Sequence, residues 1–359
     1  MAKRWKTGSR HNDSETFELT GDLFARPAER SPESYDFLVA GEALPDFEVS
    51  APAAGAGAVP TPEDIHRLRV DELSSRRKIH YISFGSGSSG NSSYIGDDET
   101  GLLIDAGVEP DKIYDALDRH GLSVKNIKGI CLTHDHSDHV RYVYTLLRKN
   151  PHIALYCTPR VLTGMLRRHN ISRRIKDYHH AIYKEFPFKV GNFEVTAFEV
   201  SHDGSDNAGY YITSGDFSFA VATDLGCVTD RVDYYMRRAS HIMLESNYDL
   251  DMLHNGPYPF HLQARIEAFT GHLDNKVTAR FLADIYTPRL KHVFLCHLSH
   301  ENNTPEAALA TVCAALRETG VHSIGDGSDS IESRDAAVQV VALPRHESSP
   351  LFLLEMQEM

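Results

Sequence analysis

The 359-residue sequence has few cysteines and no apolar run long enough to cross a membrane. The five cysteines are scattered and lie mostly in apolar segments: Cys131, Cys157, Cys227, Cys296 and Cys313. This distribution argues against a disulfide framework and is typical of buried side chains in a reducing compartment. The N-terminal segment also lacks the apolar core of a secretory signal. Together these absences predict a cytoplasmic protein without a membrane partner.

Basic residues are in the minority, because 37 Lys and Arg stand against 50 Asp and Glu, giving a net charge of −13. Such a charge disfavours a nucleic-acid partner overall. Locally, however, residues 141–176 contain nine Lys or Arg and no Asp or Glu. The densest part of this basic stretch comprises Arg167, Arg168, Arg173, Arg174 and Lys176. These five residues are candidates for binding a phosphate backbone, and the simpler alternative is a solvated helix face.

The sequence contains 41% hydrophobic and 24% charged residues, which is ordinary for a globular chain. Residues 1–77 differ from the rest, since they include a basic, polar start and an Ala-, Gly- and Pro-rich run over 51–60. We therefore predict that residues 1–77 are a largely disordered or loosely docked extension. Residues 78–359 are predicted to form one catalytic domain, in which strands alternate with helices in an α/β pattern. One long helix is expected over 139–149.

The most informative segment is Thr133–His139, which reads Thr-His-Asp-His-Ser-Asp-His and follows an apolar strand predicted over 129–132. It places three imidazoles and two carboxylates within seven residues. These donors suit Zn²⁺, Mn²⁺ or Fe, and a tight loop presents them alternately to two cations. The alternative is a solvated polar loop after a strand. The density of ligand types favours a metal site.

The residues His134, His136, Asp138 and His139 resemble the signature of the metallo-β-lactamase fold hydrolases. That family completes its site with a further His, a bridging Asp and a final His, each at the end of a strand. The candidates in this sequence are His202, Asp224 and His297, which end the predicted strands 193–200, 217–222 and 293–296. The resemblance implies a four-layer αββα sandwich with the metal site at one end of two facing sheets.

Four further segments resemble motifs of the YycJ/WalJ-like subfamily, whose members look like DNA-acting exonucleases. They occupy residues 84–91, 245–248, 271–275 and 297–303. The whole resemblance covers roughly residues 78–320. Two positions depart from the usual pattern, since Asp135 replaces a frequent Glu and Asp274 replaces a common Ser. The second change bears on the orientation of His272.

The resemblance implies two divalent metal ions, Zn or Mn, with Fe as an alternative. His134, His136 and His202 would bind one ion and Asp138, His139 and His297 the other, with Asp224 bridging them. Two cations that share a hydroxide lower its pKa towards neutrality and draw charge off a phosphoryl oxygen.

Two residues have proposed catalytic roles in this scheme. Asp138 would orient the hydroxide for in-line attack, and His272 would give a proton to the leaving 3′ oxygen or stabilise the charge that develops on it. The alternative for His272 is a helix-capping histidine.

The glycine- and serine-rich segment 84–91 follows a predicted strand and offers Ser86, Ser88, Ser89 and Asn91 to a phosphate or to the metal ligands. The alternative interpretation of this segment is a tight hairpin with glycines at positive φ. Asp105 would hold a ligand imidazole by its free ring N–H. It could equally cap the turn at residues 106–107.

Three functions fit these residues. The preferred one is a dinuclear-metal-dependent phosphodiesterase acting on nucleic acid by metal-bound hydroxide attack, specifically a 5′-to-3′ DNA exonuclease. The alternative is a small-molecule hydrolase such as a thioesterase, lactonase or cyclic phosphodiesterase, since a fold does not fix the substrate. A binding or scaffold protein without turnover is opposed by the complete ligand set. The oligomeric state is left open.

Overall fold

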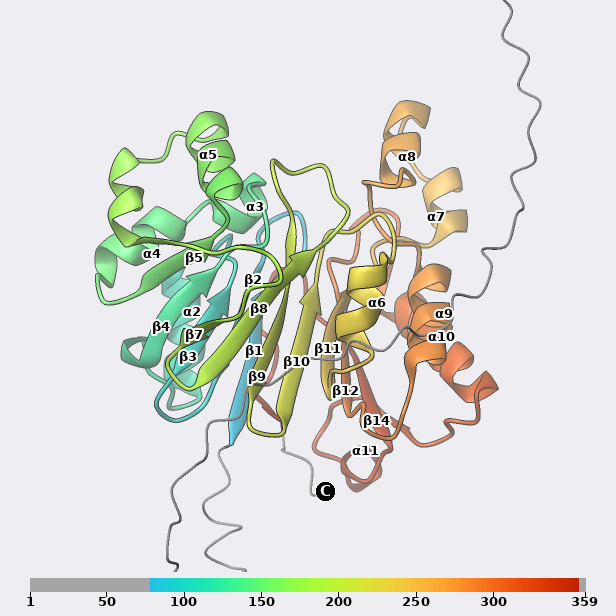
Figure 1. Ribbon diagram of the computed structural model, residues 1–359. Coiled ribbons are helices and arrows are strands. Elements are labelled where there is room, and N and C mark those ends of the chain that lie inside the picture. The colour runs from blue at the N-terminus through green and yellow to red at the C-terminus, as the bar shows by residue number, and fades with distance from the viewer. Residues whose placement is uncertain (1–77, 355–359) are drawn as a thin grey trace, which may run out of the picture. The chain divides into compact units, whose positions relative to one another are not determined.

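The computed structural model of the protein describes residues 78–354. Within this range two β-sheets face each other, and helices cover their outer faces (Figure 1). The predicted extension 1–77 and the last five residues, 355–359, lie outside the described residues. Among the residues that are described, no helix is long and apolar enough to cross a membrane.

The first sheet has seven strands in the order β15-β1-β2-β3-β4-β5-β6. Its strands β3 to β6 run parallel, and the other neighbouring pairs are antiparallel. The bounds are β1 Ile79–Gly85, β2 Ser92–Gly96, β3 Gly101–Ile104, β4 Ile127–Cys131, β5 Ala154–Cys157, β6 His179–Ala181 and β15 Phe352–Leu354.

The second sheet has eight strands in the order β13-β14-β12-β11-β10-β9-β8-β7. Strands β7 to β10 are antiparallel, whereas β10, β11, β12, β14 and β13 run parallel. The bounds are β7 Phe188–Val190, β8 Phe193–Glu199, β9 Ala208–Ser214, β10 Phe217–Ala222, β11 His241–Glu245, β12 His292–Cys296, β13 Ile324–Gly325 and β14 Val338–Ala342.

Helices flank both sheets (Figure 1). The α-helices are α2 Pro110–Arg119, α3 Ser137–Val140, α4 Val143–Lys149, α5 Pro159–Arg168, α6 Asp230–Met236, α7 Leu250–Asn255, α8 Phe260–Ile266, α9 Asn275–Ile285, α10 Pro305–Glu318 and α11 Ile331–Arg334. Helix α10 begins after Thr304, whose hydroxyl accepts a hydrogen bond from the Ala307 N–H and so caps the helix.

Three apolar clusters hold the layers together. Between the sheets, the ring of Tyr81 lies 4.4 Å from that of Phe294 and 5.2 Å from that of Phe219. A second cluster joins α2, α4 and α5 to the outer face of the first sheet, and a third joins α6, α9 and α10 to the second sheet. Burial of both faces of both sheets confirms the predicted four-layer αββα sandwich.

The helix predicted over 139–149 is wrong as a single element. Helix α3 ends at Val140 and α4 begins at Val143. At the break the Tyr142 N–H donates to the carbonyl of Ala106, and the Ala106 N–H donates to the carbonyl of His139. The chain therefore pairs its backbone with the loop after β3 at this point, which ties the metal-ligand loop to the first sheet.

Candidate metal centre

The predicted ligands come from separate segments that meet at one end of the sandwich. His134 to His139 occupy the loop after β4 and the start of α3, and the other three follow β8, β10 and β12. Asp224 and His297 have positive φ values of 52° and 54°, and Asp105 after β3 has 62°. Left-handed backbone costs a residue other than glycine about 1–2 kcal/mol, so these side chains are held in place by the surrounding structure.

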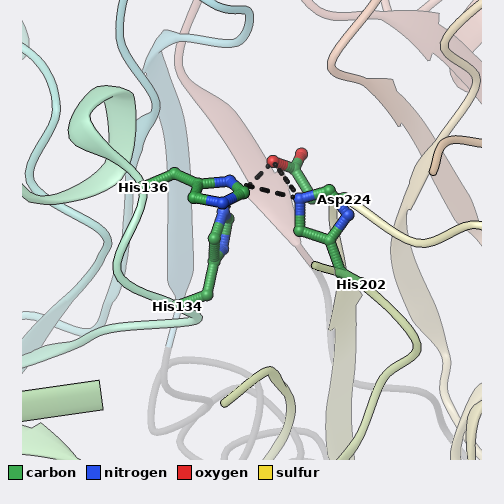
Figure 2. A group of neighbouring side chains, drawn as sticks. All are labelled: His134, His136, His202 and Asp224. Atoms are coloured by element: carbon green, nitrogen blue, oxygen red, sulfur yellow. Dashed lines mark hydrogen bonds and ion pairs between the residues drawn. The ribbon is translucent and has the colours of Figure 1, made fainter. Parts of the chain in front are cut away.

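The first group comprises His134, His136, His202 and Asp224, whose ligand atoms all lie within 4.8 Å of one another. Figure 2 shows the three imidazoles and the carboxylate pointing toward one another. The Oδ2 atom of Asp224 lies 3.4 Å from His134 Nε2 and 3.8 Å from His202 Nε2. His202 Nε2 lies 3.3 Å from His136 Nδ1.

The second group comprises Asp138, His139, His297 and, again, Asp224. Asp224 Oδ2 lies 3.1 Å from His139 Nε2, and its Oδ1 lies 2.8 Å from His297 Nδ1. Asp138 Oδ2 lies 3.5 Å from His139 Nε2 and 3.8 Å from His297 Nε2. The structure therefore brings all seven predicted ligands into two groups that share Asp224.

The donors fit divalent cations. The Nε2 atoms of His134 and His297 are buried and have no hydrogen-bond partner within residues 78–354. A buried polar atom without a partner is costly, and a bound cation satisfies it. Burial and the neighbouring His139 lower the pKa of His134 to about 3, which keeps this imidazole in the neutral form that binds metal. Nitrogen and carboxylate donors of this kind suit Zn²⁺ and Mn²⁺.

Asp224 is ionised in this environment. Burial alone would raise its pKa, but the neighbouring imidazoles of His297 and His139, together with the close contact of His134, hold the pKa of this carboxyl well below its usual range. An anionic carboxylate at the junction of the two groups is the form that a cation requires.

Asp105 holds one of the candidate ligands. Its Oδ2 lies 2.8 Å from His139 Nδ1, and its Oδ1 accepts a hydrogen bond from the Thr133 N–H. The Thr133 hydroxyl lies 2.9 Å from His134 Nδ1. Because the carboxylate contacts the ring nitrogen of His139 and the residue Thr133 in the loop after β4, the prediction that it supports an imidazole agrees with its contacts.

The segment 84–91 supports the two groups through several contacts. The Ser86 hydroxyl accepts from the His297 N–H, and Asn91 Nδ2 donates to Asp138 Oδ2 at 3.1 Å. Ser88 lines the cavity in front of the metal groups. Ser89 is not among the residues that line this cavity, and its hydroxyl lies 2.9 Å from the Nδ1 atom of His346.

The glycines of this segment are not explained by positive φ, so the hairpin interpretation is wrong in that respect. They permit close approach instead. A Cβ on Gly90 would lie 2.5 Å from the carbonyl oxygen of Gly107, which lies in the loop after β3. A Cβ on Gly107 itself would lie 1.5 Å from the carbonyl oxygen of Asp138. Only glycine at these positions lets the β1–β2 loop, the loop after β3 and the backbone of Asp138 pack this tightly.

Glu245 is a supporting residue whose role the sequence does not predict. It is fully buried at the end of β11, and its Oε1 lies 2.7 Å from His272 Nδ1 and 2.9 Å from His297 Nδ1. Its Oε2 accepts hydrogen bonds from the N–H groups of Leu225 and Leu273. An acidic residue at the end of an apolar strand was the available signal. We infer that Glu245 orients both imidazoles.

His272 lies beside the two groups, with its ring centroid 5.2 Å from those of both His202 and His297. It lines a cavity of about 260 Å³ together with Asp138 and Ser88. The helix-capping alternative is wrong, because Asp274 caps α9 by accepting from the N–H groups of residues 276 and 277. Burial would lower the pKa of His272, but the adjacent Glu245 raises it overall.

Two aspartates next to the predicted ligands have different surroundings. Asp203 Oδ1 lies 3.2 Å from His136 Nε2, and its Oδ2 accepts a hydrogen bond from Arg265. Asp135 is buried and accepts hydrogen bonds from the backbone and hydroxyl of Ser205. Asp135 therefore links the loop that carries His134 to the one that carries His202.

The five basic residues predicted to bind a phosphate backbone do not all lie together in the structure. Arg167, Arg173 and Lys176 line one pocket between α5 and the following 3-10 helix, Arg173–Tyr178. Arg168 lies 3.4 Å from the buried Asp135, which offsets its charge, and Arg174 is exposed. Three of the five predicted residues thus share a surface hollow.

The αββα sandwich and the two groups of His and Asp donors place the protein in the class of metal-dependent hydrolases. Residues 100–297 match the family model described as the beta-lactamase superfamily domain. The chain therefore belongs to the metallo-β-lactamase superfamily.

Two curated relatives carry names that describe an activity. Exodeoxyribonuclease YycJ of Bacillus anthracis is 35% identical over 249 residues, which span 67% of this chain and 90% of the relative. Exodeoxyribonuclease WalJ of Streptococcus pneumoniae is 32% identical over 249 residues, spanning 69% of this chain and 91% of the relative. The solved metallo-beta-lactamase fold protein YhfI from Bacillus subtilis shares the fold, with a TM-score of 0.51 at 13% identity, covering 77% of this chain and 100% of its own.

Proposed function

We propose that this protein is a dinuclear-metal-dependent phosphodiesterase that acts on nucleic acid as a 5′-to-3′ DNA exonuclease. The observation that carries the proposal is the sharing of Asp224 by two complete sets of His and Asp donors. The names of the two curated relatives support DNA as the substrate. The basic residues around α5 offer a surface for a phosphate backbone.

The two groups of His and Asp donors that share Asp224 supply the proposed metal ligands. His134, His136 and His202 would hold one ion, Asp138, His139 and His297 the other, and Asp224 would contact both. When bound, two divalent cations lower the pKa of water and draw negative charge off the scissile phosphate.

The protein's own side chains supply the remaining chemistry. Asp138 borders the cavity, where its carboxylate would accept a hydrogen bond from the attacking water and fix its direction. His272 would donate a proton to the leaving 3′ oxygen, and Glu245 would hold its ring in place through Nδ1. A raised pKa for His272 matches the role of a proton donor.

The test is to incubate metal-loaded protein with end-labelled single- and double-stranded DNA, with RNA and with a panel of thioesters and lactones. We expect metal analysis to give about two ions per chain, as shared-ligand sites do. We expect a 5′ label to leave DNA in the first products, while a 3′-labelled strand shortens progressively. Cleavage of a thioester or lactone without cleavage of any nucleic acid would instead support the small-molecule hydrolase.

The basic pocket near α5 gives a separate prediction. Changing Arg167, Arg173 and Lys176 together to Ala should weaken DNA binding and flatten its salt dependence, by about 0.7–0.9 in the logarithmic slope for each phosphate that the variant no longer neutralises. Hydrolysis of a small phosphodiester should change far less. The measurement is the dissociation constant for DNA across a series of salt concentrations.

A matched control removes three exposed basic residues elsewhere, at Arg119, Lys125 and Lys128. This variant should keep the wild-type slope. If both triple variants behave alike, the stretch around α5 is a solvated face and does not bind DNA.

A further inference from the structure

A second, smaller cavity lies on the other side of the glycine-rich segment 84–91. It has a volume of about 100 Å³ and is bounded by the backbone of Gly85, Gly90 and Gly107. Its polar lining includes the side chains of Ser89, Glu109, Lys112, Arg141, Arg345 and His346. These side chains come from the β1–β2 loop, from α2 and the turn before it, from the residue after α3 and from the segment after β14, so four parts of the chain build the cavity.

The cavity carries an excess of positive charge. Within residues 78–354, Lys112, Arg141 and Arg345 form no ion pair with an acidic side chain, in contrast to exposed cations such as Lys149. Arg141 donates one hydrogen bond to the carbonyl of Ser89, and Arg345 donates to the carbonyls of residues 298 and 299. Backbone carbonyls fix these guanidinium groups without neutralising them.

One carboxylate, Glu109, lines the same cavity, and it lies 3.3 Å from the hydroxyl of Tyr142. Three cations and one carboxylate leave an excess of two positive charges around the cavity. A phosphate monoester carries about −1.5 to −2 charges at neutral pH, whereas a phosphodiester carries only one. The charge of the cavity therefore matches a monoester.

The two cavities lie on either side of one short loop. Ser88 lines the cavity of the metal groups and the next residue, Ser89, lines the small one. Further along the same loop, the Asn91 N–H donates to the carbonyl of Asp138, a predicted ligand. A strand that crosses the loop at Ser88 and Ser89 would thus present neighbouring phosphate groups to the two cavities.

We propose that the small cavity binds the terminal 5′-phosphate of the DNA strand whose first internucleotide linkage lies at the metal groups. This inference rests on the proposed function. A cavity of about 100 Å³ accepts a phosphate but not a nucleoside, since pockets for larger ligands measure about 300–1,000 Å³. Anchoring the strand end in this way confines cleavage to the first linkage and makes the enzyme an exonuclease.

The product of each cleavage is again a ligand for this cavity. Water attacks the phosphorus, the bond from phosphorus to the 3′ oxygen breaks, and that oxygen takes up a proton. The released nucleotide keeps its 5′-phosphate and gains a 3′-hydroxyl. The shortened strand retains the attacked phosphate as its new 5′-phosphate, so the strand can advance by one nucleotide and bind in the same way.

The test compares single-turnover rates of the first cleavage for two DNA strands of the same sequence, one with a 5′-phosphate and one with a 5′-hydroxyl. Only the first cleavage is informative, because it creates a 5′-phosphate on either strand. Metal-loaded full-length protein should cleave the phosphorylated strand at least about tenfold faster, the scale of one or two hydrogen bonds to a charged group. In the Lys112→Gln/Arg141→Gln variant the two rates should become nearly equal.

The control variant Lys125→Gln/Lys128→Gln removes the same charge from exposed positions outside the cavity and should keep the preference. If the double variant does not fold, Lys112→Gln alone, at an exposed position of α2, replaces it and should reduce the preference. Cleavage of both strands at equal rates by the wild type overturns this inference and leaves the proposed function standing. A preference for a 3′-phosphorylated end also overturns it, whereas no cleavage of DNA overturns the proposed function itself.

Discussion

Replacing Asp224 by Asn should abolish hydrolysis and remove bound metal at the same time. The carboxylate lies between 2.8 and 3.8 Å from nitrogen atoms of four imidazoles, those of His134, His139, His202 and His297. Because it belongs to both donor groups, its loss weakens both sites together. We expect activity to fall by more than about 100-fold, since even residues that only support metal ligands have effects of 10–100-fold.

Asparagine is the informative substitution at this position. Asp224 has a φ of 52°, and Asn adopts this left-handed conformation more readily than most residues, so the backbone is preserved. The measurements are metal content per chain, hydrolysis of DNA and the thermal midpoint of unfolding. Asp216→Asn, an exposed position at the opposite end of β10, is the matched control and should behave as the wild type. An Asp224→Asn protein that retains two ions and full activity would contradict the shared-ligand arrangement.

Replacing His272 by Ala should lower the rate of DNA hydrolysis by about 10²–10⁴-fold, the usual contribution of a proton-transfer group, while leaving the metal content unchanged. The loss should be much smaller for a phosphodiester with a nitrophenyl leaving group, which departs without a proton. Comparing kcat on these two substrates separates proton donation from a structural role. His120→Ala, at an exposed position after α2, is the control.

The same experiment would also reveal whether His272 is a metal ligand and not a proton donor. His272 belongs to a third group of possible ligands with Asp224, Glu245 and His297. If His272→Ala lost an ion and its rate fell equally on both substrates, His272 would be a metal ligand. The contacts of Glu245 argue against this, because its two oxygens already accept from two backbone N–H groups and contact two imidazoles.

Much of the candidate site was predictable because the information is local. Five donors lie within Thr133–His139, and a loop of seven residues cannot separate them widely. The family resemblance indicated His202, Asp224 and His297, each of which follows an apolar strand in the sequence. The helix expected over 139–149 was wrong because periodicity cannot reveal that Tyr142 pairs with the backbone of Ala106.

The alternation of strands and helices and the types of donor that bind cations follow from the amino-acid sequence alone. The groups that support these donors depend on the tertiary structure. Strand β11 lies between β10 and β12, and this order places Glu245 beside Asp224 and His297, residues that are far apart in the chain. The cavity of Lys112, Arg141 and Arg345 likewise depends on the packing of α2, α3 and the segment after β14. Neighbours across a sheet are fixed by the burial of whole faces, which no short stretch of sequence encodes.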